Sequence, residues 1–182
     1  MYDISGEIDA DHTFALKTTS RTSPHNGPKH PLSVDCFVED RVFEVKALIK
    51  MVDESSAEPY GCNPKGGINS TCPILTVETF YEEGDPKYLY SSNIALYEWK
   101  AEKFNQFHAY FKITENMTAA NTANVYFEKP PAGIDLIIDD IEVKEFQPVP
   151  VGNLYVEGND NVSPDCEVIV TNGNAEVSQN LF

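Results

Sequence analysis

The sequence has few basic residues: thirteen Lys and Arg side chains stand against twenty-nine Asp and Glu, giving a net charge of −16. Nucleic-acid binding needs a basic surface, and an anionic membrane would repel this charge, so the composition argues against both partners. No apolar run approaches the roughly 20 residues of a membrane-spanning helix. Neutral ligands, cations and basic partners remain. We expect most of the acidic excess simply to keep the protein soluble.

Zinc and redox motifs are also missing, because the spacing of the four cysteines fits neither. Residues 1–14 lack the apolar core of a signal peptide, so the protein is either cytosolic or exported through a signal outside this sequence. The even number of cysteines and the N-glycosylation triplets at Asn69, Asn116 and Asn161 favour an oxidising compartment. We therefore predict a secreted glycoprotein, extracellular or in a cell wall.

A catalytic arrangement is not visible either. Adjacent residues of a strand point to opposite faces, so neither Asp139/Asp140 nor Glu82/Glu83 forms the facing carboxylate pair of a glycoside hydrolase. The four histidines are scattered, and no nucleophile lies next to a base in any recognisable pattern. We predict that the protein is not an enzyme.

Strand patterns, in contrast, are frequent. Apolar residues alternate with polar ones over residues 41–52, 107–113 and 124–128. The residues expected to face inward are Phe43, Val45, Ala47, Ile49, Met51, Phe107, Ala109, Phe111, Ile113, Val125 and Phe127. About seven such strands, separated by turns rich in Pro, Gly and Asn, predict an all-β fold, an antiparallel β-sandwich.

The order of these strands resembles a known family. The segments "HTFALKTTSRTSPHNGP", "DCFVEDRVFEVKALIK", "FHAYFKIT" and "NVYFEKPPAGIDLIIDDIEV" follow one another as in carbohydrate-binding modules of families 4, 9 and 22, over about His12 to Phe146. The resemblance implies a jelly-roll β-sandwich that binds a polysaccharide such as xylan, β-glucan or cellulose without cleaving it.

The resemblance also suggests how the chain is organised. Residues 1–146 would form the module, residues 147–165 a linker, and residues 166–182 ("CEVIVTNGNAEVSQNLF") the opening strand of such a module. This tail either folds back to complete the first domain or begins the next repeat. Neighbouring modules of a longer chain are expected partners.

The resemblance and the strand alternation together give the predicted sugar-binding residues. Arg21, Tyr126 and Glu128 match cleft positions of family-22-like relatives, whereas Lys46 or Leu48 replaces an aromatic residue there. Alternation places further outward residues on the same sheet face as these. The predicted carbohydrate-binding set is Arg21, Lys46, His108, Tyr110, Tyr126 and Glu128. Alternatively, Tyr126 and Glu128 belong to an ordinary solvated face, and Arg21 pairs with Glu128.

A structural Ca²⁺ is the cofactor that the resemblance implies. Asp139 would be one ligand, on the same face as Ile137, Ile141 and Val143, and Glu176 the second if the tail folds back. The alternative is that Asp139 accepts hydrogen bonds from a turn.

The four cysteines allow three pairings. A local disulfide between Cys62 and Cys72 would close the loop "CNPKGGINSTC", and Cys36 would then pair with Cys166 and attach the tail.

The main alternative to a glycan-binding function is a structural or adhesive extracellular repeat, stabilised by calcium and disulfides, without a working cleft.

Overall fold

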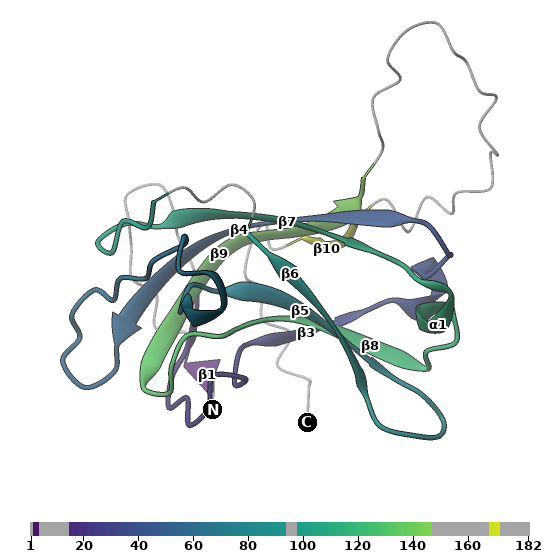
Figure 1. Cartoon of the computed structure of the whole chain (residues 1–182), viewed down its shortest axis with the longest axis horizontal. Coiled ribbons are helices and arrows are strands. Elements are labelled where there is room, and N and C mark those ends of the chain that lie inside the picture. Colours follow the sequence, from purple (N-terminus) through teal and green to yellow (C-terminus); the bar gives the residue numbers. More distant parts are fainter. Residues whose placement is uncertain (1, 4–14, 94–97, 147–167, 172–182) are drawn as a thin grey trace, which may run out of the picture.

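The computed structural model describes residues 2–3, 15–93, 98–146 and 168–171, and in this part most of the chain is β-strand. Two antiparallel sheets lie face to face (Figure 1), which confirms the predicted β-sandwich. The strands are β1 (Tyr2–Asp3), β2 (Leu16–Thr18), β3 (Lys29–Leu32), β4 (Val42–Asp53), β5 (Ile74–Phe80), β6 (Lys87–Ser92), β7 (Asn105–Lys112), β8 (Thr122–Glu128), β9 (Ile134–Glu145) and β10 (Val168–Thr171). The short helices are η1 (Val34–Cys36), η2 (Gly67–Asn69) and α1 (Glu115–Thr118).

The two sheets differ in size. The larger one has six strands in the order β1-β2-β9-β4-β7, and β10 also pairs with β9. The smaller one has four strands in the order β3-β8-β5-β6. The loop between β2 and β3 therefore crosses from the large sheet to the small one. This crossing puts residues 19–28 beside the small sheet.

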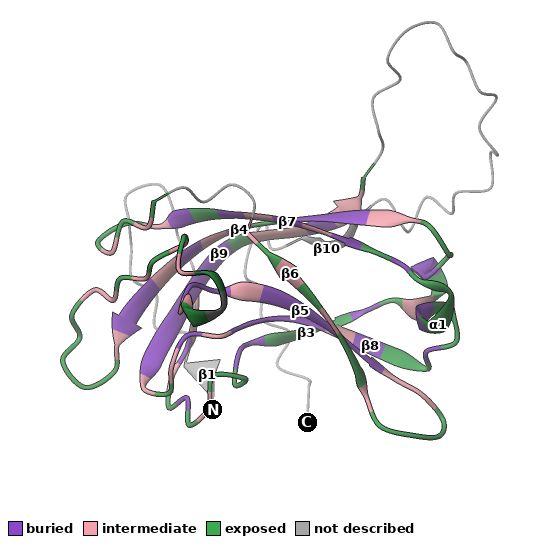
Figure 2. Cartoon of the chain, in the orientation of Figure 1, coloured by how far each residue is buried: buried purple, intermediate pink, exposed green. Residues whose placement is uncertain are grey.

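The core lies between the sheets, and Figure 2 shows buried residues along β4, β5, β8 and β9. The alternation in β4, β7 and β8 holds as predicted. All eleven residues expected to face inward are buried in one apolar cluster. Phe107 of β7 meets Phe127 of β8 edge to face, with ring centroids 5.0 Å apart, so aromatic packing connects the two sheets.

The alternation in β9 breaks at one residue. Asp140 has a φ of 48°, and the register of β9 against β4 shifts there, which is the pattern of a β-bulge. Ile137 lies outside the main core, in a small cluster with Ala15 and Val52, whereas Val143 lies within the main core. The prediction that Asp139 shares a face with Ile137 is consistent with the strand period. The prediction that it also shares one with Val143 and Ile141 is wrong, because the bulge reverses the alternation.

The described part of the tail belongs to the large sheet. β10 pairs antiparallel with β9 at residues 142–144, on the edge of β9 that also pairs with β2. This strand therefore adds to the present domain. The predicted linker, Glu176 and the glycosylation triplet at Asn161 lie outside the described residues.

The disulfide between Cys62 and Cys72 is present, as predicted. Cys36 is disulfide-bonded as well, and its predicted partner Cys166 lies outside the described residues. A disulfide of this kind fits an oxidising compartment. No helix in the described part of the chain is long and apolar enough to cross a membrane.

Candidate functional site

A cleft of about 690 Å³ lies against the outer face of the four-stranded sheet. Its volume falls in the range of about 300–1,000 Å³ that is usual for small-ligand pockets. One wall comes from the end of β2 and the loop that follows, and the rest comes from β3, β5, β6 and β8. The lining residues are Thr18, Thr19, Ser20, Arg21, His25, Asn26, Gly27, Lys29, Glu78, Tyr88, Tyr90 and Tyr126.

An ion pair lies beside Tyr126, which is only 4% exposed. Lys29 Nζ lies 2.6 Å from Glu78 Oε2 and 4.7 Å from the centroid of the Tyr126 ring. Burial raises the pKa of Tyr126 well above its usual value, and the carboxylates of Glu128 and Glu78 raise it further. Because the Lys29 ammonium lies over this ring, Tyr126 offers little face for a sugar to stack on.

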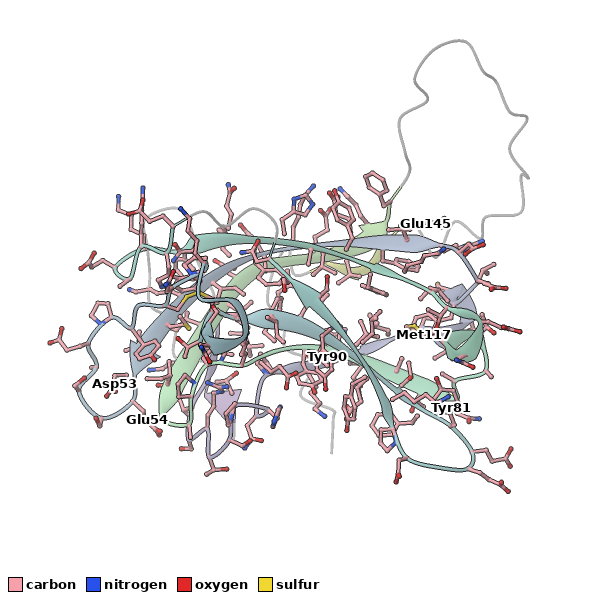
Figure 3. All side chains as sticks on the ribbon, in the orientation of Figure 1. Asp53, Glu54, Tyr81, Tyr90, Met117 and Glu145 are labelled. Atoms are coloured by element: carbon pink, nitrogen blue, oxygen red, sulfur yellow. A yellow bond between two sulfur atoms is a disulfide. The ribbon has the colours of Figure 1, made fainter. Side chains whose placement is uncertain are left out.

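Two tyrosines of β6 border the cleft and stay exposed. Tyr88 is 46% exposed and Tyr90 59%, and their rings are nearly parallel, with an angle of 15° and centroids 6.4 Å apart. They pair with Glu78 and Thr76 of β5, and Tyr90 projects from the small sheet away from β4 and β9 (Figure 3). Desolvation raises the pKa of Tyr88, and so does its hydrogen bond to the Glu78 carboxylate.

Arg21 holds the wall of the cleft in place. Its side chain is 2% exposed, and all five of its N–H groups donate to backbone carbonyls. Two of these carbonyls belong to Pro24 and Asn26 of its own loop, two lie in the turn between β8 and β9, and one belongs to the first residue of β9. Burial lowers the pKa of Arg21, and the nearby carboxylates of Asp135 and Glu128 oppose this shift. The role seen in the structure is to fix the loop, since no N–H group is left for a ligand.

Glu128 is also engaged within the protein. Its side chain is 2% exposed, and one oxygen accepts a hydrogen bond from the Thr76 hydroxyl at 2.6 Å. The other oxygen lies 2.7 Å from Nδ1 of His25, whose side chain is 74% exposed and lines the cleft. Glu128 therefore orients His25, which was not among the predicted residues.

The remaining predicted residues lie on the other sheet. Lys46 belongs to β4, and His108 and Tyr110 belong to β7, so their outward face is that of the six-stranded sheet. The prediction that they share a face with Tyr126 and Glu128 is wrong. Alternation shows which residues point outward, but it does not show to which of the two sheets a strand belongs.

These three residues surround a buried carboxylate, Glu44. His108 Nε2 lies 2.7 Å from Oε1, the Tyr110 hydroxyl donates to the same oxygen at 3.2 Å, and Lys46 Nζ donates to Oε2 at 2.9 Å. Burial by itself would raise the pKa of Glu44, but hydrogen bonds from Lys46 and His108 lower it overall.

The two exposed tyrosines were missed in the sequence. The segment "KYLYSS" alternates, but Leu89 is the single apolar residue among its inward positions. The segment also follows directly after the turn "EEGDP". The spacing of the two tyrosines was the available signal, because residues two positions apart in a strand point to the same face.

Asp139 is the one predicted calcium ligand that lies within the described residues. Asp139 is 4% exposed, and its Oδ1 accepts a hydrogen bond from the Asp140 amide at 2.9 Å. No group of three or more His, Cys, Asp or Glu side chains that could hold a metal ion occurs among the described residues, but calcium also binds backbone carbonyl oxygens. The second predicted ligand, Glu176, lies outside this part, so calcium binding stays a prediction.

Comparison with known proteins finds similarity in structure. No protein-family model and no curated protein sequence matches the chain. The xylan-binding domain CBM22-1 of Paenibacillus barcinonensis Xyn10C matches with a TM-score of 0.58 and 19% identity, over 82% of this chain and 83% of that one. The C-terminal family 22 carbohydrate-binding module of Clostridium thermocellum Xyn10B matches with a TM-score of 0.59 and 15% identity, over 82% and 83%.

A tandem of two modules, CBM22-1 and CBM22-2 of the Paenibacillus protein, matches with a TM-score of 0.60 and 19% identity, over 82% of this chain and 40% of that one. The structural neighbours are thus carbohydrate-binding modules, as the sequence resemblance predicted. At these identities the likeness shows the fold, which is the predicted jelly-roll β-sandwich.

Proposed function

We propose that this chain is a secreted, non-catalytic carbohydrate-binding module that binds a polysaccharide of the xylan type in the cleft of the four-stranded sheet. Two of its structural neighbours are described as xylan-binding domains, which supports this proposal. One neighbour carries two modules in tandem, which supports a multimodular parent protein.

The exposed pair Tyr88 and Tyr90 carries this proposal. A pyranose ring presents a flat C–H face that packs on an aromatic ring, and its hydroxyl groups need hydrogen-bonding partners. The cleft offers both, because Thr19, Ser20 and Asn26 line it together with the two tyrosines. A neutral chain would also not be repelled by the net charge of −16.

The cleft does not favour catalysis. Glycoside hydrolases use two carboxyl groups about 5–9.5 Å apart. Glu78 is the single carboxylate among the described residues that line the cleft, and Lys29 already pairs with it. Among the described residues, the cleft therefore lacks the second, facing carboxyl group that glycoside hydrolysis needs.

Secretion has independent support. The Cys62–Cys72 disulfide is formed. Two predicted glycosylation sites, Asn69 and Asn116, lie exposed on the surface. Glycan attachment at these positions needs such exposure.

Affinity gel electrophoresis with soluble xylan tests the proposal. We expect the protein to be retarded, and Tyr90→Ala to weaken binding about tenfold, which corresponds to about 1.4 kcal/mol of stacking. Tyr110→Ala is the matched control, because this tyrosine lies on the other sheet, and it should migrate like the wild type. Wild-type protein that no neutral or acidic polysaccharide retards would instead favour the adhesive repeat.

A further inference from the structure

Among the described residues that line the cleft, every charged side chain is engaged by another group of the protein. Arg21 is buried, and its N–H groups all donate to carbonyls. Lys29 pairs with Glu78 at 2.6 Å, and His25 contacts Glu128 at 2.7 Å. A protonated His25 would therefore also find its counter-charge already in place.

The Lys29–Glu78 pair is held on several sides. Glu78 is 4% exposed, and besides Lys29 it accepts hydrogen bonds from Asn124, at 3.4 Å, and from Tyr88. Lys29 also lies over the Tyr126 ring, which attracts its ammonium group. Withdrawing Lys29 from Glu78 to serve a ligand would leave a buried carboxylate without its cation, which is costly.

A glycan that carries uronic acid groups would bring a carboxylate into this setting. Moving a uronic acid carboxylate from water into the cleft is favourable only if it meets a cation that does not already pair with another anion. The rest of the protein would also repel it, since the net charge is −16. Both effects weaken the binding of an acidic glycan chain, and neither affects the binding of a neutral one.

We propose that the cleft selects an uncharged glycan chain over one that bears uronic acid groups, and that the Lys29–Glu78 ion pair is the element that makes this selection. This inference rests on the proposed function, because it names the charge class of the glycan bound in the same cleft. It assigns Glu78 the task of neutralising Lys29, which would otherwise attract an anion.

Isothermal titration calorimetry with two probes tests it: neutral xylohexaose, and a xylo-oligosaccharide of the same backbone length that carries one glucuronic acid group. We expect wild-type protein to bind the neutral probe at least about tenfold more tightly. Raising NaCl from about 20 to 500 mM should leave neutral binding unchanged and strengthen the weak acidic binding, because salt screens the repulsion.

Glu78→Gln is the decisive variant, since it keeps the side-chain shape and leaves Lys29 uncompensated. Its preference for the neutral probe should fall about fivefold, the size of one partly exposed ion pair. Glu44→Gln removes the same charge on the other sheet and is the matched control, with no change in preference expected. The comparison of the two probes on wild-type protein tests the selection even if a variant fails to fold.

Equal or tighter wild-type binding of the acidic probe overturns the selection. A wild-type preference that Glu78→Gln and Glu44→Gln both retain would assign the selection to the overall charge and overturn the role of the ion pair. Wild-type protein that binds neither probe refutes the proposed function itself, and the inference with it.

Discussion

The outer faces of the two sheets carry similar kinds of side chain in different arrangements. On the six-stranded sheet, Tyr110, His108 and Lys46 all turn to one carboxylate, Glu44, which is only 7% exposed. On the four-stranded sheet, charged groups also pair with one another, but Tyr88 and Tyr90 remain uncovered next to a cleft.

From this difference we infer what makes one polar sheet face a candidate binding site. A network in which every polar group is satisfied stabilises the fold and leaves nothing for a ligand. Among the described residues, the cleft side combines a loop that crosses over the sheet edge with two exposed, nearly parallel tyrosine rings. The other face has one exposed aromatic ring, Phe146, which is 39% exposed and packs edge to face on Tyr110.

The largest effect is expected where the crossing loop touches the small sheet. A Cβ atom on Gly27 would lie 1.6 Å from the carbonyl oxygen of Phe127 in β8, a backbone atom that cannot easily move. Gly27→Ala should therefore displace the loop and destabilise the fold by about 3 kcal/mol. It should also weaken xylohexaose binding, because His25 and Asn26 move with the loop.

Chemical denaturation and calorimetry measure these two changes. Gly61→Ala is the control, since the nearest atom to its Cβ is 4.0 Å away, and it should behave like the wild type. A stable Gly27→Ala protein with unchanged binding would show that the loop does not shape the cleft.

Much of the fold could be predicted from the sequence because apolar and polar residues alternate in β4, β7 and β8. In β4 the five inward residues from Phe43 to Met51 are apolar without exception, because that strand lies between β9 and β7 and packs against the core along its length. The edge strand β6 buries little, so its pattern is weak, and the tyrosines that matter most for the cleft were overlooked.

Two other features have no local signature. The bulge at Asp140 reverses the faces of β9 after Asp139, and an aspartate in a left-handed conformation looks like any other aspartate in the sequence. The sheet to which a strand belongs depends on pairing with distant strands. Lys46 and Tyr126 are both outward residues, and nothing near either one shows that they lie on opposite sides of the protein.

A smaller effect is expected for the Glu44 network. Glu44→Gln should destabilise the protein by about 1–2 kcal/mol at neutral pH, because hydrogen bonds to a charged acceptor are lost. The folded-state pKa of Glu44 lies below its unfolded value, so its charge stabilises the fold above the unfolded pKa and this contribution disappears as pH falls through the folded pKa. Urea denaturation of both proteins across this pH range measures the difference, and a gap that widens on acidification would contradict the assignment.

The smallest effect is expected for Lys46, a predicted sugar-binding residue that lies on the six-stranded sheet. Its side chain is 46% exposed, and its ion pair with Glu44 is one of several contacts to that carboxylate. Lys46→Met should therefore cost only about 0.5 kcal/mol, as is usual for exposed pairs, and salt should reduce even that difference. Xylohexaose affinity should stay at the wild-type value, because the cleft lies on the opposite sheet. A clear loss of affinity in this variant, with an unchanged melting temperature, would mean that both faces contact the glycan and that the contrast between them is wrong.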